Sequence, residues 1–406
     1  MSGHAPPDGT TGTSALPPSD GATEEAPAAS DGTTEETPAP PPPELVCLGE
    51  SMVTFLPDRP GRLADVTAFT RAIGGAESNV ACALAAVGHR VRWVGRVGRD
   101  GFGDHLVEAI GGYGVDVSAV RRDPHRPTGV YFRTATDRAA DGHEVAYYRA
   151  GSAASAMSPA TVPYSSVAGA RILHLTGITA ALSADCLALM RELTAPRPRR
   201  PLVSFDVNHR PGLWRRDPAA EVLLELARRA DLVFVGADEA EALWGVADPA
   251  AIREVLPEPA GLVVKRGGEG AVVFERGPDP GGAAFRPAHD TVTHVPAPRV
   301  DVVAPVGAGD AFAAGFLSGV LRGLDARARL RHGHLMAAAA LTVPGDLAVP
   351  PARHPATTPH GAAARRPSWI DHADRLAALD EAAWGTLHLG PGWTVRQGPD
   401  QEVRTP

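Results

Sequence analysis

Apolar residues along the chain fall into short continuous runs and longer stretches with helical spacing. The runs typical of buried strands lie at 45–48, 91–95, 171–175, 202–206, 232–235 and 261–265. The stretches with helical spacing lie near 76–87, 103–111, 184–194, 218–229, 238–244 and 326–342. Strands that alternate with helices in this way predict an α/β fold: a doubly wound, mainly parallel sheet with helices on both faces.

Strict alternation of polar and apolar residues predicts smaller β elements beside this sheet. Residues 129–134 and 144–149 predict a hairpin, and residues 52–71 predict short strands and turns. We expect these segments, over about 52–71 and 128–150, to form a small β lid. Another hairpin is expected at 271–276 and 284–295.

Composition divides the chain into unequal parts. The first 44 residues are rich in Pro, Thr, Ala, Gly and Ser, with eight acidic residues and no Lys or Arg. Such a segment cannot bury enough apolar surface to become ordered. We therefore expect a disordered acidic tail over 1–43, a folded domain over 44–350, and a Pro- and Ala-rich linker with a C-terminal extension over 351–406. Within that extension, residues near 369–384 are amphipathic.

Charge and hydropathy exclude several classes of function. The acidic tail alone accounts for the net charge of −8, so the folded part is near neutral and lacks the basic face of a nucleic-acid-binding protein. No apolar run reaches the length of about 18 residues that suggests a membrane span. The N-terminus lacks the basic and apolar regions of a secretory signal. Together these features predict a cytoplasmic protein with no nucleic-acid or membrane partner.

The segment Gly307-Ala308-Gly309-Asp310 carries the clearest chemical signal, because it precedes an apolar helix. Free backbone N–H groups and the helix dipole attract an anion there, and the glycines let a phosphate approach closely. A carboxylate beside a phosphate is unfavourable unless it accepts a proton from an attacking hydroxyl. The alternative is an ordinary helix start with an acidic cap.

The chain has 39 Lys and Arg residues, of which only Lys265 is lysine. This suggests that arginine would not serve at that position. Lys265 does not lie in a Walker A loop, and the first strand is not followed by a dinucleotide-binding GxGxxG motif. Residues 206–210 and 265–270 each follow a predicted strand, so both clusters are expected to face one crevice with the 307–310 turn.

Several motifs resemble the ribokinase-like (PfkB) carbohydrate kinases over about residues 44–350. They are GGAESN at 74–79, GRDGFG at 98–103, PTGVY at 127–131, YYRAGSAAS at 147–155, FDVNHRPGLW at 205–214 and GAGDAF at 307–312. The motifs at 147–155 and 205–214 look like the 2-keto-3-deoxygluconate kinase branch. The resemblance implies a ribokinase-like fold whose lid pairs between subunits, with ATP and Mg²⁺ as cofactors.

The resemblance also implies roles for individual residues. Asp310 would be the general base, and the amides of Gly307, Ala308 and Gly309 would stabilise the transferring phosphoryl group. Lys265, Gly267 and Gly270 would border the nucleotide, and Glu239 would organise Mg²⁺ through water. The expected sugar contacts are Gly75, Asn79, Tyr131, Tyr147, Arg149, Asn208, Arg210 and Asp346. The two arginines suit the carboxylate of a sugar acid, because their guanidinium groups are fork-shaped donors.

Two positions depart from the family pattern. Gly236 stands where the family usually has the Asn of an NxxE motif, although Glu239 is kept. Ala304 stands where an acidic residue precedes the GAGD motif, which casts doubt on a monovalent-cation site of the ribokinase kind. Neither departure removes the expected base or the anion site.

The sequence therefore predicts a carbohydrate kinase, a 2-dehydro-3-deoxygluconokinase that forms the 6-phosphate. Two alternatives stay open. One is a kinase of the same family for fructose, ribose or a nucleoside. The other is a non-catalytic sensor of sugar or nucleotide on this fold. The departures from the family pattern at Gly236 and Ala304 are compatible with this alternative.

Overall fold

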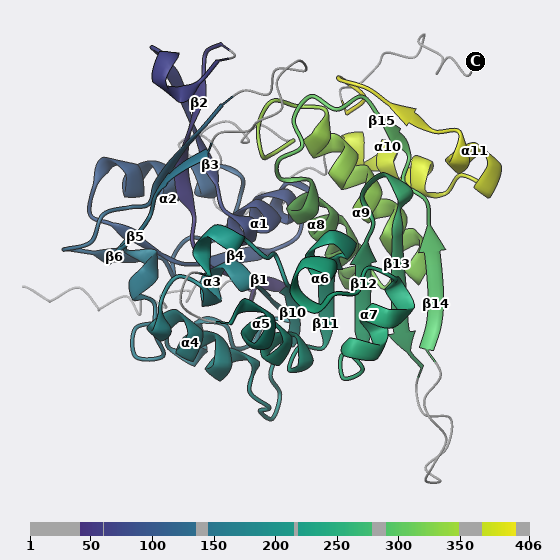
Figure 1. The fold of residues 1–406 in the computed structure, drawn as a ribbon, viewed down its shortest axis with the longest axis horizontal. Helices are drawn as coiled ribbons and strands as arrows, with labels where there is room; N and C mark the ends of the chain where they lie inside the picture. The colour runs from purple at the N-terminus through teal and green to yellow at the C-terminus, as the bar shows by residue number, and fades with distance from the viewer. Residues whose placement is uncertain are drawn as a thin grey trace, which may run out of the picture. The chain divides into compact units, whose positions relative to one another are not determined.

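An eight-stranded sheet forms the core of the described structure (Figure 1). The computed structural model describes residues 41–59, 61–134, 145–214, 218–277, 290–348 and 368–394. From one edge to the other, the strands are β14 (Asp290–Val295), β13 (Ala271–Arg276), β12 (Gly261–Lys265), β11 (Leu232–Gly236), β10 (Leu202–Asp206), β9 (Ile172–Thr176), β1 (Leu45–Leu48) and β4 (Val91–Val94). The strands from β12 to β4 pair in parallel, and β13 and β14 pair antiparallel. The predicted doubly wound, mainly parallel sheet is confirmed.

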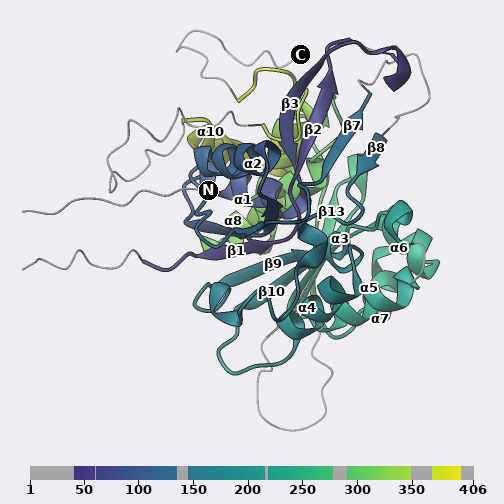
Figure 2. The ribbon, with the colours of Figure 1, turned by 90° about the vertical axis from the view of Figure 1, so that its left-hand side faces the viewer.

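Helices cover both faces of this sheet, because its central strands are apolar on both faces. On one side lie α1 (Ala76–Ala86), α2 (Gly101–Gly112), α8 (Ala308–Leu321) and α9 (Ala326–Leu341). On the other lie α3 (Gly177–Ala180), α4 (Ala184–Thr194), α5 (Ala219–Arg228), α6 (Ala237–Trp244) and α7 (Pro249–Val255) (Figures 1 and 2). Strand β11 shows the division: Phe234 packs on Phe316 of α8, with ring centroids 5.4 Å apart, while Val233 belongs to the opposite core.

The segments that were expected to form the lid belong to a separate four-stranded sheet, called the lid below (Figure 2). Its order is β3 (Phe69–Gly74), β2 (Met52–Pro57), β7 (Val130–Arg133) and β8 (Val145–Tyr148). Strands β2 and β7 pair in parallel, so the two segments expected to form the lid share one sheet. Phe55 and Phe132 stack between these strands with ring centroids 4.7 Å apart, whereas Tyr147 and Tyr148 on β8 are exposed.

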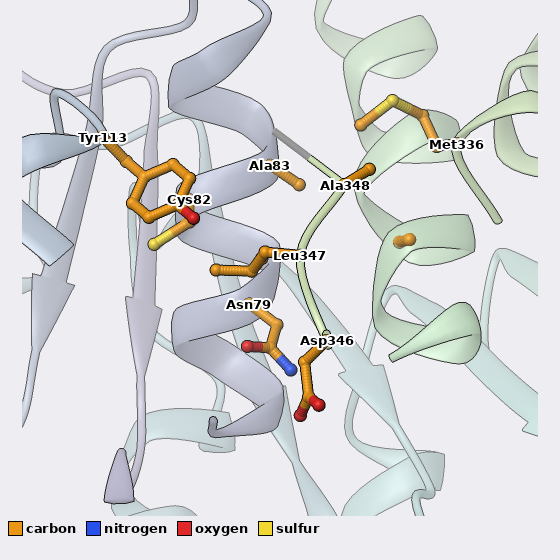
Figure 3. A pocket seen from close by; sticks show the side chains of 9 residues that line it. Asn79, Cys82, Ala83, Tyr113, Met336, Asp346, Leu347 and Ala348 are labelled. Atoms are coloured by element: carbon orange, nitrogen blue, oxygen red, sulfur yellow. The ribbon is translucent and has the colours of Figure 1, made fainter. Parts of the chain in front are cut away.

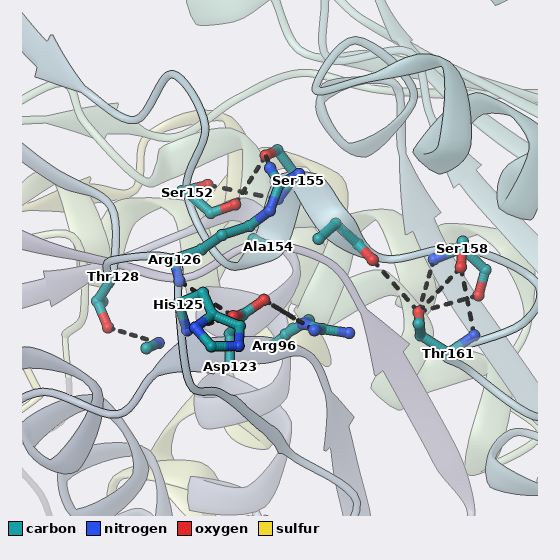
Figure 4. A network of polar contacts seen from close by, with 12 residues as sticks. Arg96, Asp123, His125, Arg126, Thr128, Ser152, Ala154, Ser155, Ser158 and Thr161 are labelled. Atoms are coloured by element: carbon teal, nitrogen blue, oxygen red, sulfur yellow. Dashed lines mark hydrogen bonds and ion pairs between the residues drawn. The ribbon is translucent and has the colours of Figure 1, made fainter.

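Hydrogen bonds fix the chain at the base of the lid (Figure 4). Strands β5 (Arg96–Gly98) and β6 (Arg121–Asp123) pair in parallel there. Asp123 accepts hydrogen bonds from Arg96 and from the backbone amide of Arg126. Arg126 donates to Ser155 Oγ at 3.2 Å, and Ser155 Oγ donates to the Ser152 carbonyl at 2.7 Å. The segment before β7 is thereby tied to the segment after β8.

The amphipathic stretch expected near 369–384 forms two short helices. Helices α10 (Ser368–Ala377) and α11 (Glu381–Gly385) precede β16 (His388–Leu389), which pairs in parallel with β15 (Arg299–Val300). Trp384 on α11 is 1 % exposed, and its indole N–H donates to the Pro296 carbonyl at 2.9 Å. From α9, Arg331 donates to the Ala377 carbonyl at 3.0 Å. The C-terminal helices are therefore attached to the sheet domain.

Some expectations lie outside the described residues. Most of the predicted tail over 1–43 and all of the linker at 350–367 fall there, so the domain boundaries stay predictions. The structure also contains elements that the sequence pattern did not predict, namely α3, α7 and the two short parallel strand pairs. Within the part that the structure covers, no helix combines the length and apolar character needed to cross a lipid bilayer.

The buried indole of Trp384 gives a test of the C-terminal packing. Trp384→Ala should lower the free energy of unfolding by about 3–5 kcal/mol, because it leaves a cavity and removes the bond to Pro296. Denaturant unfolding measures this change. Val292→Ala, at a side chain of β14 that is 56 % exposed, is the control and should stay within about 1 kcal/mol of the wild type. Equal stability of both variants would show that α11 does not pack as described.

Candidate active site

The turn before α8 has the geometry of an anion site. Gly307 caps α8 with a left-handed backbone (φ 77°), which favours glycine. A β carbon at this position would also collide with the backbone of Asp346. The first backbone N–H groups of α8 have no acceptor within the helix, and the positive end of its dipole lies with them.

Two side-chain amides hold the Asp310 carboxylate in the first turn of α8. Asn79 Nδ2, from α1, donates to Oδ2 at 2.9 Å, and Asn208 Nδ2, after β10, donates to Oδ1 at 3.4 Å. Burial raises the pKa of Asp310 to about 7; the Asn79 hydrogen bond opposes the shift, and the charges of Asp206 and Asp346 add to it. Asp310 is therefore partly ionised near neutral pH, which suits a group that accepts a proton from a hydroxyl.

The same two asparagines each keep one buried acceptor. Asn79 Oδ1 and Asn208 Oδ1 have no hydrogen-bond partner among the described residues. Asn208 also has a left-handed backbone (φ 40°), which asparagine adopts more readily than most residues. A buried acceptor without a donor costs free energy, so hydroxyl groups of a ligand would be favoured here. The sequence predicted both asparagines as sugar contacts but did not foresee that they hold Asp310.

Lys265 forms an ion pair inside the site. It ends β12, and its Nζ lies 2.8 Å from Oδ2 and 3.2 Å from Oδ1 of Asp206, which ends β10. The ammonium also lies near the α8 turn: a β carbon on Gly309 would be 3.6 Å from Nζ. Burial acts to lower the pKa of Lys265, but the charges of Asp206, Glu239 and Asp310 outweigh it and raise that pKa. Lys265 therefore stays positively charged.

The two glycines after β12 have a structural explanation of their own. Gly267 and Gly270 have left-handed backbones, with φ of 55° and 114°. A β carbon on Gly270 would also collide with the backbone of Val295 in β14. The tight turn after β12 thus accounts for both glycines, and their contact with a nucleotide stays a prediction.

Asp346 joins the site from the loop after α9. It lies beside Asn79 at a small pocket that Cys82, Tyr113 and Leu347 also line (Figure 3). Tyr131 in the lid donates its hydroxyl to Asp346 Oδ2 at 3.3 Å, and Arg133 Nη2 lies 3.1 Å from Oδ1. Burial raises the pKa of Asp346, and Arg133 opposes this shift. The sequence did not indicate Arg133, whose partner is more than 200 residues away along the chain.

Arg149 is paired with a carboxylate instead of being open to a ligand on all sides. Its guanidinium forms an ion pair with Glu50, which also accepts a hydrogen bond from Ser152 Oγ at 2.7 Å. Arg149 is 9 % exposed and Glu50 is 2 % exposed. A β carbon on Gly75 would collide with the Glu50 carbonyl, so Gly75 lies against the same residue. The position of Glu50, directly after the first buried strand, was the one available sequence signal for it.

Arg210 carries the most loosely compensated charge of the predicted sugar contacts. Its side chain is 51 % exposed, and the nearest carboxylate oxygen, Glu239 Oε1, is 3.9 Å away. Glu239 accepts hydrogen bonds from the backbone amides of Gly236 at 2.8 Å and His209 at 3.0 Å. Tyr147 is half exposed, with its ring centroid 5.5 Å from that of Tyr131. Among the described residues, no three His, Cys, Asp or Glu side chains are grouped to hold a metal ion.

Comparisons with known proteins show to which family the chain belongs. Residues 42–353 match the family described as pfkB family carbohydrate kinase. The 2-dehydro-3-deoxygluconokinase of Bacillus subtilis is 37% identical over 75% of this chain and 91% of its own length. The enzyme of the same name from Thermoproteus tenax is 36% identical over 74% of this chain and 89% of its own. An uncharacterised sugar kinase from Pyrococcus horikoshii, solved in complex with ATP, is 25% identical, with a TM-score of 0.64 over 76% of this chain and 95% of that one.

Replacement of Asp310 should separate activity from folding. If Asp310 is the general base that the sequence predicts, Asp310→Asn should lose about 10²–10⁴-fold in turnover, because the amide cannot accept a proton in its place. The raised pKa makes the ionised carboxylate unfavourable in the folded state, a cost that is absent below the unfolded pKa of about 3.9 and complete above pH 7. The variant should therefore be at least as stable as the wild type at pH 8 in thermal unfolding. Near-normal turnover would remove Asp310 from the mechanism.

The pH dependence of kcat/KM should change when the hydrogen bond from Asn79 to Asp310 is removed. If Asp310 accepts the proton of the acceptor hydroxyl in its ionised form, kcat/KM should fall as pH drops below about 7. Asn79→Ala removes a bond that favours the carboxylate, so the acidic limb should move to higher pH. Ser78→Ala, at the neighbouring buried residue of α1, is the control and should leave the limb in place. If the acidic limb of kcat/KM is unchanged in Asn79→Ala, a group other than Asp310 determines its position.

Proposed function

Because the chain belongs to the pfkB family of carbohydrate kinases, we propose that it transfers the terminal phosphoryl group of ATP to 2-keto-3-deoxygluconate at position 6. Asp310 accepts the proton of the attacking hydroxyl, and the amides at the start of α8 hold the negative charge that develops on the phosphoryl group. The observation that carries this proposal is the Asp310 carboxyl, which Asn79 and Asn208 hold in the first turn of α8 and whose pKa is raised to about 7.

The charges around the sugar side favour an acid as the substrate. Arg133 and Arg149 are each neutralised by a buried carboxylate, Asp346 and Glu50. Arg210 is only loosely compensated at 3.9 Å, so its guanidinium can bind the carboxylate of a sugar acid. The names of the relatives from Bacillus subtilis and Thermoproteus tenax support the same substrate.

The residues at the site fit a magnesium ion that is held mainly by the nucleotide. Asp206 is engaged by Lys265, and both oxygens of Glu239 accept backbone amides. A cage of three protein carboxylates is therefore not available within the described structure. Mg²⁺ on the ATP phosphates would spread their negative charge, and Glu239 could contact it through water.

The lid completes the proposal. Tyr131 connects it to Asp346 at 3.3 Å, so the lid lies over the sugar side of the site, where it would exclude water. Strand β8 is the edge of the lid sheet, and Tyr147 and Tyr148 on it are exposed. We also propose that this edge pairs between two copies of the chain.

An ADP-release assay tests the substrate. With ATP and Mg²⁺, turnover should be highest with 2-keto-3-deoxygluconate and low with fructose, ribose and adenosine. Arg210→Met should lower kcat/KM for the sugar acid by about 10- to 100-fold, the value of a charge-assisted hydrogen bond. Arg228→Met is the control: this arginine on α5 is also about half exposed but is remote from the site, and its removal should leave kcat/KM unchanged.

The other outcomes distinguish the remaining functions. Preferred turnover of fructose, ribose or adenosine, with Arg210→Met unchanged, would make the chain a kinase for a neutral sugar or nucleoside. Nucleotide binding without turnover of any of these acceptors would instead favour a sensor on the same fold.

A further inference from the structure

The pair of Asp206 and Lys265 lies within the site but takes no part in the proton transfer described above. The two residues end strands β10 and β12, which are separated by β11. The Lys265 side chain therefore crosses the end of β11 to reach Asp206. Asp206 is 1 % exposed, and besides Lys265 it accepts the backbone amide of Asn208 at 3.2 Å. The burial of the Asp206 carboxylate is costly even with this partner, so a role in the site explains the pair more readily than stability does.

The ammonium is placed close to where the phosphoryl group must pass. Its Nζ lies 3.6 Å from the position that a β carbon on Gly309 would occupy, in the first turn of α8. Two of its three N–H groups are directed to the Asp206 oxygens, at 2.8 and 3.2 Å. One N–H group is left for another acceptor.

This geometry explains why the only lysine of the chain stands at this position. An arginine beside Asp206 would form a planar, two-pronged pair in which its donors face the carboxylate. A tetrahedral ammonium can hold the carboxylate and still donate in another direction. Of the 39 Lys and Arg residues in the chain, only Lys265 is lysine, which is consistent with a requirement for an ammonium group at this position.

We propose that Asp206 is a positioning residue: it holds the Lys265 ammonium beside Gly309, so that the third N–H group of Lys265 binds the phosphoryl group during transfer. This inference rests on the proposed phosphoryl transfer at Asp310. It adds a fixed cation to the backbone amides of α8, and it assigns to Asp206 a role that acts through Lys265.

The single lysine allows a direct test that does not depend on turnover. Protein prepared with lysine labelled with ¹⁵N at Nζ should show one side-chain ammonium signal, because no other lysine is present. Addition of the magnesium complex of AMP-PNP should shift this signal. In Asp206→Asn the signal should broaden or disappear, because the ammonium is no longer held and its protons exchange with water. Asp290→Asn is the matched control. It breaks the ion pair between Asp290 on β14 and Arg253 on α7, and it should keep the signal.

Kinetics provide a second readout. Lys265→Met should lower kcat by about 10²–10³-fold with a smaller rise in KM for ATP, because the ammonium contacts the terminal phosphate in the ATP complex and this contact strengthens during transfer. Lys265→Arg should not restore kcat, since the guanidinium faces Asp206. Asp206→Asn should reduce kcat less, and it should move the acidic limb of kcat/KM to lower pH, because the negative charge that raises the pKa of Asp310 is gone.

The results separate this inference from the proposed function. If AMP-PNP binds by calorimetry and the ammonium signal does not move, or if Lys265→Arg keeps the wild-type kcat, the positioning role is wrong. If the signal moves as expected while no sugar acid is phosphorylated, the positioning role is supported and the proposed substrate is wrong.

Discussion

Several interactions shift the pKa of Asp310 in opposite directions, and the rest of the site depends on their balance. The dipole of α8 and the amides of Asn79 and Asn208 favour its ionised form. Burial and the nearby charges of Asp206 and Asp346 favour its protonated form. The result is a pKa of about 7, several units above that of a free aspartate, at which Asp310 can both accept and release a proton near neutral pH. Because α1, the loop after β10 and the loop after α9 all contribute to this balance, a shift of any of them would change the proton affinity of Asp310.

The positively charged side chains of the site are paired with carboxylates to different degrees. Lys265, Arg133 and Arg149 each face a buried carboxylate, supplied by Asp206, Asp346 and Glu50. Such pairs bring little net stability, because desolvation offsets their attraction, but they fix the direction of each donor before a ligand arrives. Arg210 differs, since it is half exposed and 3.9 Å from Glu239. The three paired cations can thus orient a substrate, while the guanidinium of Arg210, among these four described residues, is the least constrained by a carboxylate of the protein.

The sequence predicted the parts of this protein that depend on local pattern. Buried apolar runs gave the parallel strands, and the glycines before Asp310 indicated the start of α8, because both signals lie within a few residues. Arg133 and Glu50 escaped prediction because their partners, Asp346 and Arg149, lie about 200 and 100 residues away along the chain. The orientation of Asn79 was hidden for the same reason: a motif indicates that an amide is present, but only the fold shows that it points at Asp310. Helix α7 was missed because it is short, spanning only Pro249–Val255.

The C-terminal residues beyond the family match contact the segment that leads into the α8 turn. Strand β16 pairs with β15, and His388 lies 2.9 Å from Asp301. Trp384 donates to Pro296, just before β15, so α11 and β16 hold the same stretch at two places. This stretch runs from β14 to Gly307, whose left-handed backbone sets the direction of the amides at the start of α8. The turn before α8 is therefore supported on one side by the Asp346 loop, which packs on Gly307, and on the other by a segment that the C-terminal extension helps to fix.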